Sequence, residues 1–206
     1  MKTSEVDILM VPGWSGSGPD HWQTRWERNM KTARRVQQAD WLYPNREKWI
    51  GTLISTIAKI DSDVPVVLVA HSLGVATVAH IAQHIPQGLV AGAFMVAPAD
   101  VDHASRWPTT DGYYFDAPDH GFAPMPTDRL PFPSVLIASS NDPYCHYERA
   151  KDMAFAWGAT LVPAGDAGHI NEASGHGPWP EGLMRFGWFL KQIDVPPTGL
   201  PDPDKY

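Results

Sequence analysis

A serine near the middle of the chain, Ser72, follows directly on an apolar run. The residues VVLVAHSLG at 66–74 predict a buried strand that turns sharply into a helix. Strand and helix approach closely at such a turn, so small neighbours are needed, and Ala70 and Gly74 meet that need although Ala70 departs from the strict G-x-S-x-G pattern. The strained turn projects the serine hydroxyl outward, which makes Ser72 a candidate nucleophile. The alternative is a serine that only caps the helix beginning at Leu73.

A serine hydroxyl is a poor nucleophile until a base removes its proton, so the chain must also supply a histidine and an acid. With this strand and turn arrangement the order along the chain is serine, acid, histidine. Asp142 lies in the turn SSNDPYC at 139–145, directly after an apolar strand. Because active sites of open α/β sheets lie at the carboxyl ends of strands, we expect Asp142 to be the acid. The alternative is an aspartate that only shapes an Asx turn before Pro143.

Nine histidines are candidates for the base, but only His169 and His176 follow a strand that comes after Asp142. His169 lies in AGHIN at 167–171, soon after the strand near Leu161, and is the expected base. His176 is the alternative, or a support for the same loop. His71 adjoins Ser72, but adjacent strand residues face opposite sides, so it should point away from the nucleophile.

The negative charge on a carbonyl oxygen under attack requires preorganised donors, and the backbone N–H of Leu73 is the expected first one. The glycine-rich residues VPGWSGS at 11–17 follow the first strand and should let the backbone N–H of Trp14 face the site. The alternative is that residues 11–17 form an ordinary glycine-rich turn with no part in the site.

The segment from Pro98 to Pro133 interrupts the alternation of strands and helices, and loops this long inside compact domains are usually functional. Its aromatic residues are expected to wall a substrate pocket, namely Trp107, Tyr113, Tyr114, Phe115 and Phe122. A third interpretation takes Asp100, Asp102 and His103 in this segment as metal ligands, but such clusters in loops are usually only solvated.

Apolar runs alternate with helical periodicity, which favours a doubly wound parallel sheet covered on both faces. Strands are expected at 8–11, 64–70, 89–97, 135–139 and 160–162. Helices are expected from Asp20, as the cap, to Met30, and at 47–60, 73–84, 146–157 and 180–193. The fold class is therefore α/β, with a doubly wound sheet of about six parallel strands. We expect one domain over 1–194 and a proline-rich tail over 195–206.

The formal net charge of −7 and the lack of a basic run argue against nucleic-acid binding. No apolar stretch reaches the roughly 18 residues of a spanning helix, so no membrane association is expected. The single cysteine, Cys145, and the absence of a secretory signal favour a cytoplasmic location. The sequence predicts no oligomeric state.

Four separated motifs together resemble the small α/β-hydrolases grouped with retinoblastoma-binding protein nine and the bacterial YdeN-like proteins. They are PGWSGSGPDHWQTRWE at 12–27, VLVAHSLG at 67–74, SSNDPYC at 139–145, and AGHIN followed by SGHGPWPEG at 167–182. The resemblance implies a compact α/β-hydrolase fold with no large cap domain and a sheet without the first two strands of larger relatives. It also implies a triad of Ser72, Asp142 and His169. The Leu-x-Cys-x-Glu segment of the retinoblastoma-binding relative is not matched around Cys145, so that partner function is not carried over.

The sequence thus predicts a serine hydrolase that cleaves an ester or amide of a small molecule through an acyl-enzyme, with no metal or organic cofactor. The aromatic segment favours a small or aromatic acyl or alcohol group. The rival hypothesis is a non-catalytic protein that keeps the hydrolase scaffold and uses the aromatic segment to bind a partner.

Overall fold

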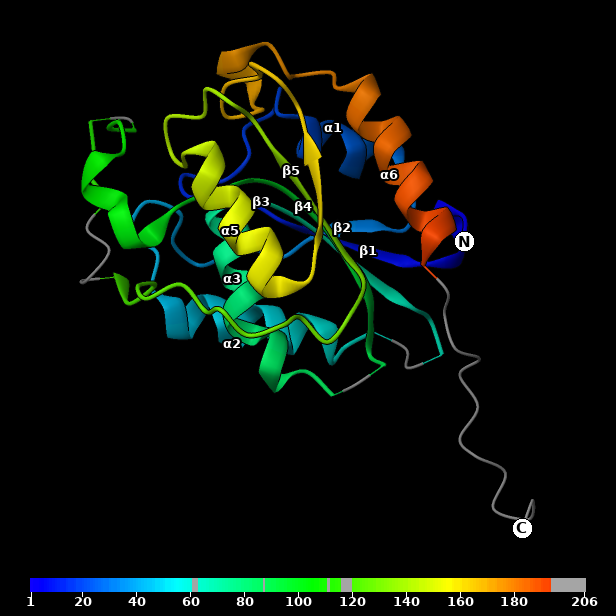
Figure 1. Ribbon diagram of the computed structural model, residues 1–206. Helices are drawn as coiled ribbons and strands as arrows, with labels where there is room; N and C mark the ends of the chain where they lie inside the picture. Colours follow the sequence, from blue (N-terminus) through cyan, green and yellow to red (C-terminus); the bar gives the residue numbers. More distant parts are fainter. Residues whose placement is uncertain (61–62, 87, 111, 116–119, 194–206) are drawn as a thin grey trace, which may run out of the picture.

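The computed structural model describes residues 1–60, 63–86, 88–110, 112–115 and 120–193, and its central element is one six-stranded sheet (Figure 1). The strands are β1 (Asp7–Val11), β2 (Ala33–Arg35), β3 (Val66–Ser72), β4 (Val90–Pro98), β5 (Ser134–Ala138) and β6 (Thr160–Pro163). They lie in the order β2-β1-β3-β4-β5-β6, and every neighbouring pair is parallel. All strands therefore end at one edge, where a site can be assembled.

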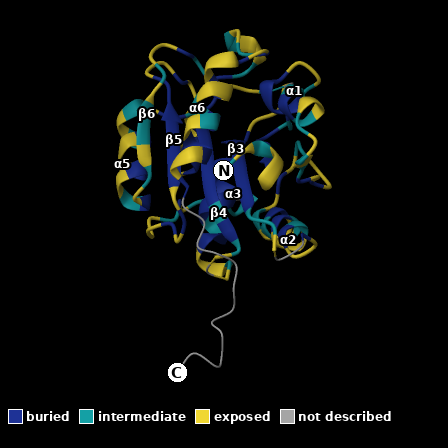
Figure 2. Cartoon of the chain, turned by 90° about the vertical axis from the view of Figure 1, so that its right-hand side faces the viewer, coloured by how far each residue is buried: buried dark blue, intermediate teal, exposed yellow. Residues whose placement is uncertain are grey.

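Helices cover both faces of the sheet (Figure 1). They are α1 (Trp22–Asn29), α2 (Arg46–Ile57), α3 (Leu73–Ile81), α5 (Tyr147–Trp157) and α6 (Pro180–Gln192). Alternate strand residues enter two separate apolar cores. Leu68 and Ala70 of β3 pack in the core beneath α2, α3 and α5, whereas Val67 and Val69 pack in the core beneath α1 and α6. Figure 2 shows the strands as the buried layer between helices whose outer sides are exposed.

The expected strands and helices all occur, with ends shifted by a few residues. Trp22 and Trp26 are buried side by side, with ring centroids 4.8 Å apart, as their spacing of four predicts. The start of α1 was predicted wrongly. His21 is its N-cap, with its side chain accepting the Gln23 N–H, while the Asp20 carboxylate pairs with Arg25.

One strand and one loop carry further differences. β2 was not located from the sequence because it has only three residues, two of them arginines, and lies at the edge of the sheet. The interrupting segment contains a short 3-10 helix at Val101–Arg106. The proline-rich tail expected over 195–206 lies outside the described residues.

No helix among the described residues is long and apolar enough to cross a membrane.

Candidate active site

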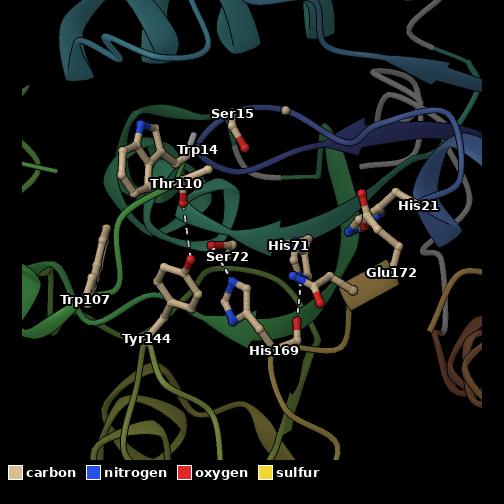
Figure 3. Close-up of a pocket in the computed structure, with 12 residues that line it drawn as sticks. Trp14, Ser15, His21, His71, Ser72, Trp107, Thr110, Tyr144, His169 and Glu172 are labelled. Carbon is tan, nitrogen blue, oxygen red and sulfur yellow. Dashed lines mark hydrogen bonds between the residues drawn. The ribbon is translucent and has the colours of Figure 1, made fainter. Parts of the chain in front are cut away.

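A small cavity of about 100 Å³ opens where the parallel strands end (Figure 3). The loops after β1, β3, β4, β5 and β6 all contribute to it. It is lined by Trp14, Ser15, Gly16, His21, His71, Ser72, Trp107, Thr110, Tyr144, His169, Asn171 and Glu172. Side chains that are far apart in the sequence therefore meet at the edge predicted for the site.

The turn at Ser72 has the strained geometry that the sequence predicts. Ser72 joins β3 to α3 with φ 57° and ψ −123°, in the region that L-residues rarely adopt. Its side chain makes no capping hydrogen bond to α3. The interpretation of Ser72 as a helix cap is therefore not supported, and its hydroxyl is directed into the cavity instead.

Two glycines allow the loop after β1 to lie against this turn. A Cβ on Gly74 would lie 2.1 Å from the carbonyl oxygen of Val11, and a Cβ on Gly13 would lie 2.6 Å from the Cβ of Ser72. Real Cβ atoms do not approach other atoms so closely. The backbones at Gly13 and Gly74 must therefore remain free of side chains if the loop is to reach the serine.

The Gly74→Ala variant should lower the free energy of unfolding by about 3 kcal/mol, because the new methyl overpacks against backbone that cannot rotate away. For a chain of this length, thermal unfolding should then occur roughly 6–12 °C lower. Gly51→Ala is the matched control, since Gly51 lies inside α2 with nothing within 4 Å of the added Cβ. It should stabilise the protein by about 0.5–1 kcal/mol. Equal melting temperatures would contradict the close approach.

The imidazole of His169 connects a serine to a carboxylate. His169 Nε2 lies 2.8 Å from the Oγ of Ser72, and His169 Nδ1 lies 2.9 Å from both carboxylate oxygens of Asp142. All three residues are buried. Since a carboxylate only accepts, Nδ1–H must donate to Asp142, which leaves the Nε2 lone pair to accept the Ser72 hydroxyl.

The loops that carry Asp142 and His169 are joined by hydrogen bonds from backbone N–H groups of one loop to side chains of the other. The Oγ of Ser139 accepts the N–H of Ala167 at 3.0 Å, and the Oδ1 of Asn141 accepts the N–H of Gly168 at 2.6 Å. On the other side, the indole of Trp22 donates to the carbonyl of Ile170 at 2.9 Å. These contacts hold His169 between fixed neighbours, so its ring is oriented by the folded chain.

In the loop after β1, near Ser72, the backbone N–H groups of Gly13 and Trp14 have no acceptor among the described residues. The N–H of Ser15 donates to the carbonyl of Trp41 and that of Gly16 to the carbonyl of Gly13, whereas the N–H of Trp14 donates to no described residue. The N–H of Leu73, at the start of α3, precedes any acceptor within its own helix. The N–H groups of Leu73 and Trp14, which are the donors expected to bind the oxyanion, therefore belong to backbone segments that adjoin the Ser72 side chain.

The other two histidines considered from sequence have different contacts. His71 lines the cavity but does not bond to Ser72; its Nε2 lies 2.8 Å from the carbonyl oxygen of His169 and so donates to it. Burial, with a smaller effect of His21 and His169, lowers the pKa of His71 well below its usual value, so it stays neutral. His176 bonds to the Oγ of Ser174 within its own loop, and His169 alone of the two expected bases reaches Ser72.

Of the five aromatic residues expected to wall the pocket, only Trp107 lines the cavity. Phe115 is buried behind it, against Trp14 and Trp107, and Phe122 is fully buried against Trp49. Tyr114 is 82% exposed, and Tyr113 packs against Tyr43 near the surface. The prediction is corrected for these four, because composition alone does not show which aromatic side chains face the loop's own core.

The acidic cluster considered as a metal site is an ion-pair network. The guanidinium of Arg149 pairs with the carboxylates of Asp100 and Asp102, and His103 Nδ1 lies 2.8 Å from Asp100. Asp102 also accepts the N–H of Met125. Within the described part of the chain, no group of three or more His, Cys, Asp or Glu side chains is arranged to hold a metal ion.

Sequence reasoning missed several residues at or near the cavity, among them Gln23, Tyr144 and Glu172. Gln23 is fully buried, accepts from the hydroxyl of Ser17 and donates to the carbonyl of Val69, which fixes the loop after β1 to β3. The ring of Tyr144 packs on His169, with centroids 4.2 Å apart. Glu172 lies at the cavity rim. The one sequence signal that could have suggested these three residues is their closeness to the motifs that contain or adjoin the expected site residues.

The comparisons with known proteins agree with this architecture. The profile of the serine hydrolase family matches residues 8–188. The chain therefore belongs to the serine hydrolase family, and its fold is that of the α/β-hydrolases. No curated protein sequence matches it significantly.

Solved structures narrow the family to its YdeN-like members. A protein described as a YdeN-like hydrolase from Pectobacterium atrosepticum is 31% identical with a TM-score of 0.79, covering 94% of this chain and 95% of that one. The ydeN gene product of B. subtilis is 20% identical with a TM-score of 0.67, covering 91% and 100%. The esterase domain of a Rhodothermus marinus protein shares the fold at 16% identity and a TM-score of 0.66, covering 91% and 87%.

Proposed function

We propose that this protein is an esterase-like serine hydrolase that cleaves an ester or amide bond of a small substrate through an acyl-enzyme. Ser72 is the nucleophile, His169 the base and Asp142 the acid that orients the base. The single observation that carries the proposal is the imidazole of His169, within hydrogen-bonding distance of the Ser72 hydroxyl on one side and of the Asp142 carboxylate on the other.

The first half of the reaction transfers the acyl group to the enzyme. As the Oγ of Ser72 attacks the substrate carbonyl carbon, His169 Nε2 takes the hydroxyl proton and Asp142 stabilises the imidazolium that forms. The backbone N–H groups of Leu73 and Trp14 donate to the oxyanion, and such preorganised donors are each worth about 3 kcal/mol. The imidazolium then protonates the leaving alcohol or amine, and the acyl group stays on Ser72.

The second half releases the acid. A water molecule takes the place of the leaving group, His169 removes its proton, and the hydroxide attacks the acyl-enzyme carbonyl. The same N–H groups stabilise the second oxyanion, and the proton returns to Ser72 as the bond breaks. Every proton transfer uses the one imidazole.

The size and walls of the cavity favour a small substrate. Pockets for drug-sized ligands are typically about 300–1,000 Å³, whereas this cavity measures about 100 Å³. Trp14, Trp107 and Tyr144 supply flat apolar surfaces on one side of Ser72, which suits a short acyl chain or a single ring.

Labelling with a fluorophosphonate probe tests the proposal. The probe forms a covalent bond with activated serines, so we expect one label per chain, located by peptide mass spectrometry on the peptide that contains Ser72. Short p-nitrophenyl esters should be hydrolysed faster than long ones. Absence of both labelling and hydrolysis would favour a binding protein on a hydrolase scaffold, and a label on another serine would move the nucleophile.

A further inference from the structure

The cavity has two chemically different ends on either side of Ser72 (Figure 3). One end is walled by the rings of Trp14, Trp107 and Tyr144. The other end is lined by the polar side chains of His21, His71 and Glu172. The apolar end can pack against an acyl chain or a ring of the substrate. The side chains of the polar end take no part in the proposed reaction.

The tautomer of His21 is fixed by its position at the start of α1. The N–H of Gln23 donates to His21 Nδ1 at 3.1 Å, so Nδ1 carries a lone pair and the proton of the neutral ring is on Nε2. His21 is only 3% exposed, and its Nε2 has no hydrogen-bond partner among the described residues. A buried donor without an acceptor lowers the stability of the fold. An oxygen atom of a bound ligand would satisfy this N–H.

His21 also remains a donor at neutral pH. Burial, with smaller contributions from His169 and Arg35, lowers its pKa to about 3. The ring is therefore uncharged, and it offers a hydrogen bond without attracting anions strongly.

Glu172 determines which kind of oxygen this end accepts. The backbone N–H of His21 donates to the carbonyl of Gly18, and a Cβ on Gly18 would lie 3.2 Å from the Oε1 of Glu172, so the Glu172 carboxylate lies beside the turn that carries His21. Of the described residues that line the cavity, Glu172 alone carries a carboxylate, and none is lysine or arginine. A substrate carboxylate would be repelled, whereas a hydroxyl can accept from His21 and donate to Glu172.

We propose that His21 is a specificity-determining residue whose Nε2–H binds a hydroxyl oxygen of the substrate, so that the preferred substrates are esters carrying a free hydroxyl near the scissile bond. This inference rests on the proposed hydrolase function. A site built to hydrogen-bond a hydroxyl discriminates strongly against the analogue that lacks it, because the buried partner is then left unpaired.

Two variants of His21 separate this role from its capping of α1. In His21→Asn, the Oδ1 takes the place of Nδ1 as the cap for the Gln23 N–H, and asparagine is a preferred N-cap, but the Nε2 donor is lost. In His21→Gln, the side-chain amide extends to the Nε2 position and keeps a donor there while the cap is weakened. Thermal unfolding of both variants reports the capping effect by itself.

The kinetic test compares esters that differ only in a hydroxyl and a methyl group. In the first pair, 2-hydroxyethyl butanoate is compared with propyl butanoate, and the hydroxyl is in the alcohol part of the ester. In the second pair, propyl 4-hydroxybutanoate is compared with propyl pentanoate, and the hydroxyl is in the acyl part. We expect the wild type to prefer the hydroxylated member of one pair in kcat/KM, and His21→Asn to lower that ratio roughly tenfold. His21→Gln should keep most of the ratio. A ratio near one for both pairs, or one that His21→Asn does not move, overturns the assignment.

A binding measurement separates this inference from the proposed hydrolase function. In the wild-type protein, glycerol should shift the ¹⁵N resonance of His21 Nε2, and 1-propanol should not. If no ester is hydrolysed, the hydrolase proposal fails and this titration alone decides the role of His21. A shift with glycerol then supports the hydroxyl site, and equal responses to the two alcohols overturn it.

Discussion

Replacing Ser72 with alanine is expected to lower kcat for ester hydrolysis roughly a million-fold, as loss of the nucleophile does in a serine protease. The Ser72 hydroxyl hydrogen-bonds to His169, and the substitution leaves the base with no proton to remove. Residual turnover should come from the backbone donors and from substrate binding alone. Steady-state rates on a short p-nitrophenyl ester, measured with active-site titration, would check this.

The same variant should change the free energy of unfolding by no more than about 1–2 kcal/mol, because it removes one hydrogen bond and no capping interaction. Ser55→Ala is the matched control, since Ser55 is an exposed serine of α2. It should alter neither rate nor stability appreciably. If Ser72→Ala kept its turnover but melted much earlier, Ser72 would be a structural residue after all.

The expected site residues that the structure brings together are those whose position depends on a strand end. Ser72 ends β3, Asp142 lies in the turn after β5 and His169 lies in the loop after β6, and in a parallel sheet all such ends lie at one edge. Strand apolarity is local and visible in the sequence. The topology then brings the three together without any long-range information.

The pocket walls could not be predicted in this way. Phe115, Phe122 and Trp107 are all aromatic residues of the same irregular segment, so composition does not distinguish them. In the structure, Phe122 fills the core over α2, whereas Trp107 faces the cavity. Which side of an irregular loop faces inward depends on tertiary packing, and the loop has no periodicity to indicate it. His21 was missed for a related reason, because its cavity contact depends on α1 lying beside the loop that carries His169.

Small errors at element ends also have a physical cause. Asp20 and His21 both carry acceptors that can cap α1, and the sequence favours the aspartate. In the folded protein Asp20 pairs with Arg25 instead, which leaves His21 to accept the Gln23 N–H. Competition between a cap and an ion pair is decided by side-chain geometry, and the sequence does not contain that directly.

Replacing Asp142 with asparagine is expected to lower kcat roughly ten-thousand-fold while changing KM little, because the base is then held in the wrong tautomer. The Oδ1 of Asp142 accepts the backbone N–H of Tyr144 at 2.9 Å. That bond should retain the amide oxygen of asparagine, which turns its NH₂ toward His169 Nδ1. Nδ1 must then accept, the ring proton moves to Nε2, and no lone pair faces Ser72.

The tautomer itself can be measured. In the ¹⁵N spectrum of the wild type, His169 should carry its proton on Nδ1, and in Asp142→Asn on Nε2. Asp152→Asn, an exposed change of the same kind in α5, should leave both the spectrum and kcat unaltered. A loss below tenfold with the tautomer unchanged would mean that another group orients the imidazole. A large loss with the switched tautomer would tie the rate to the direction in which His169 presents its lone pair.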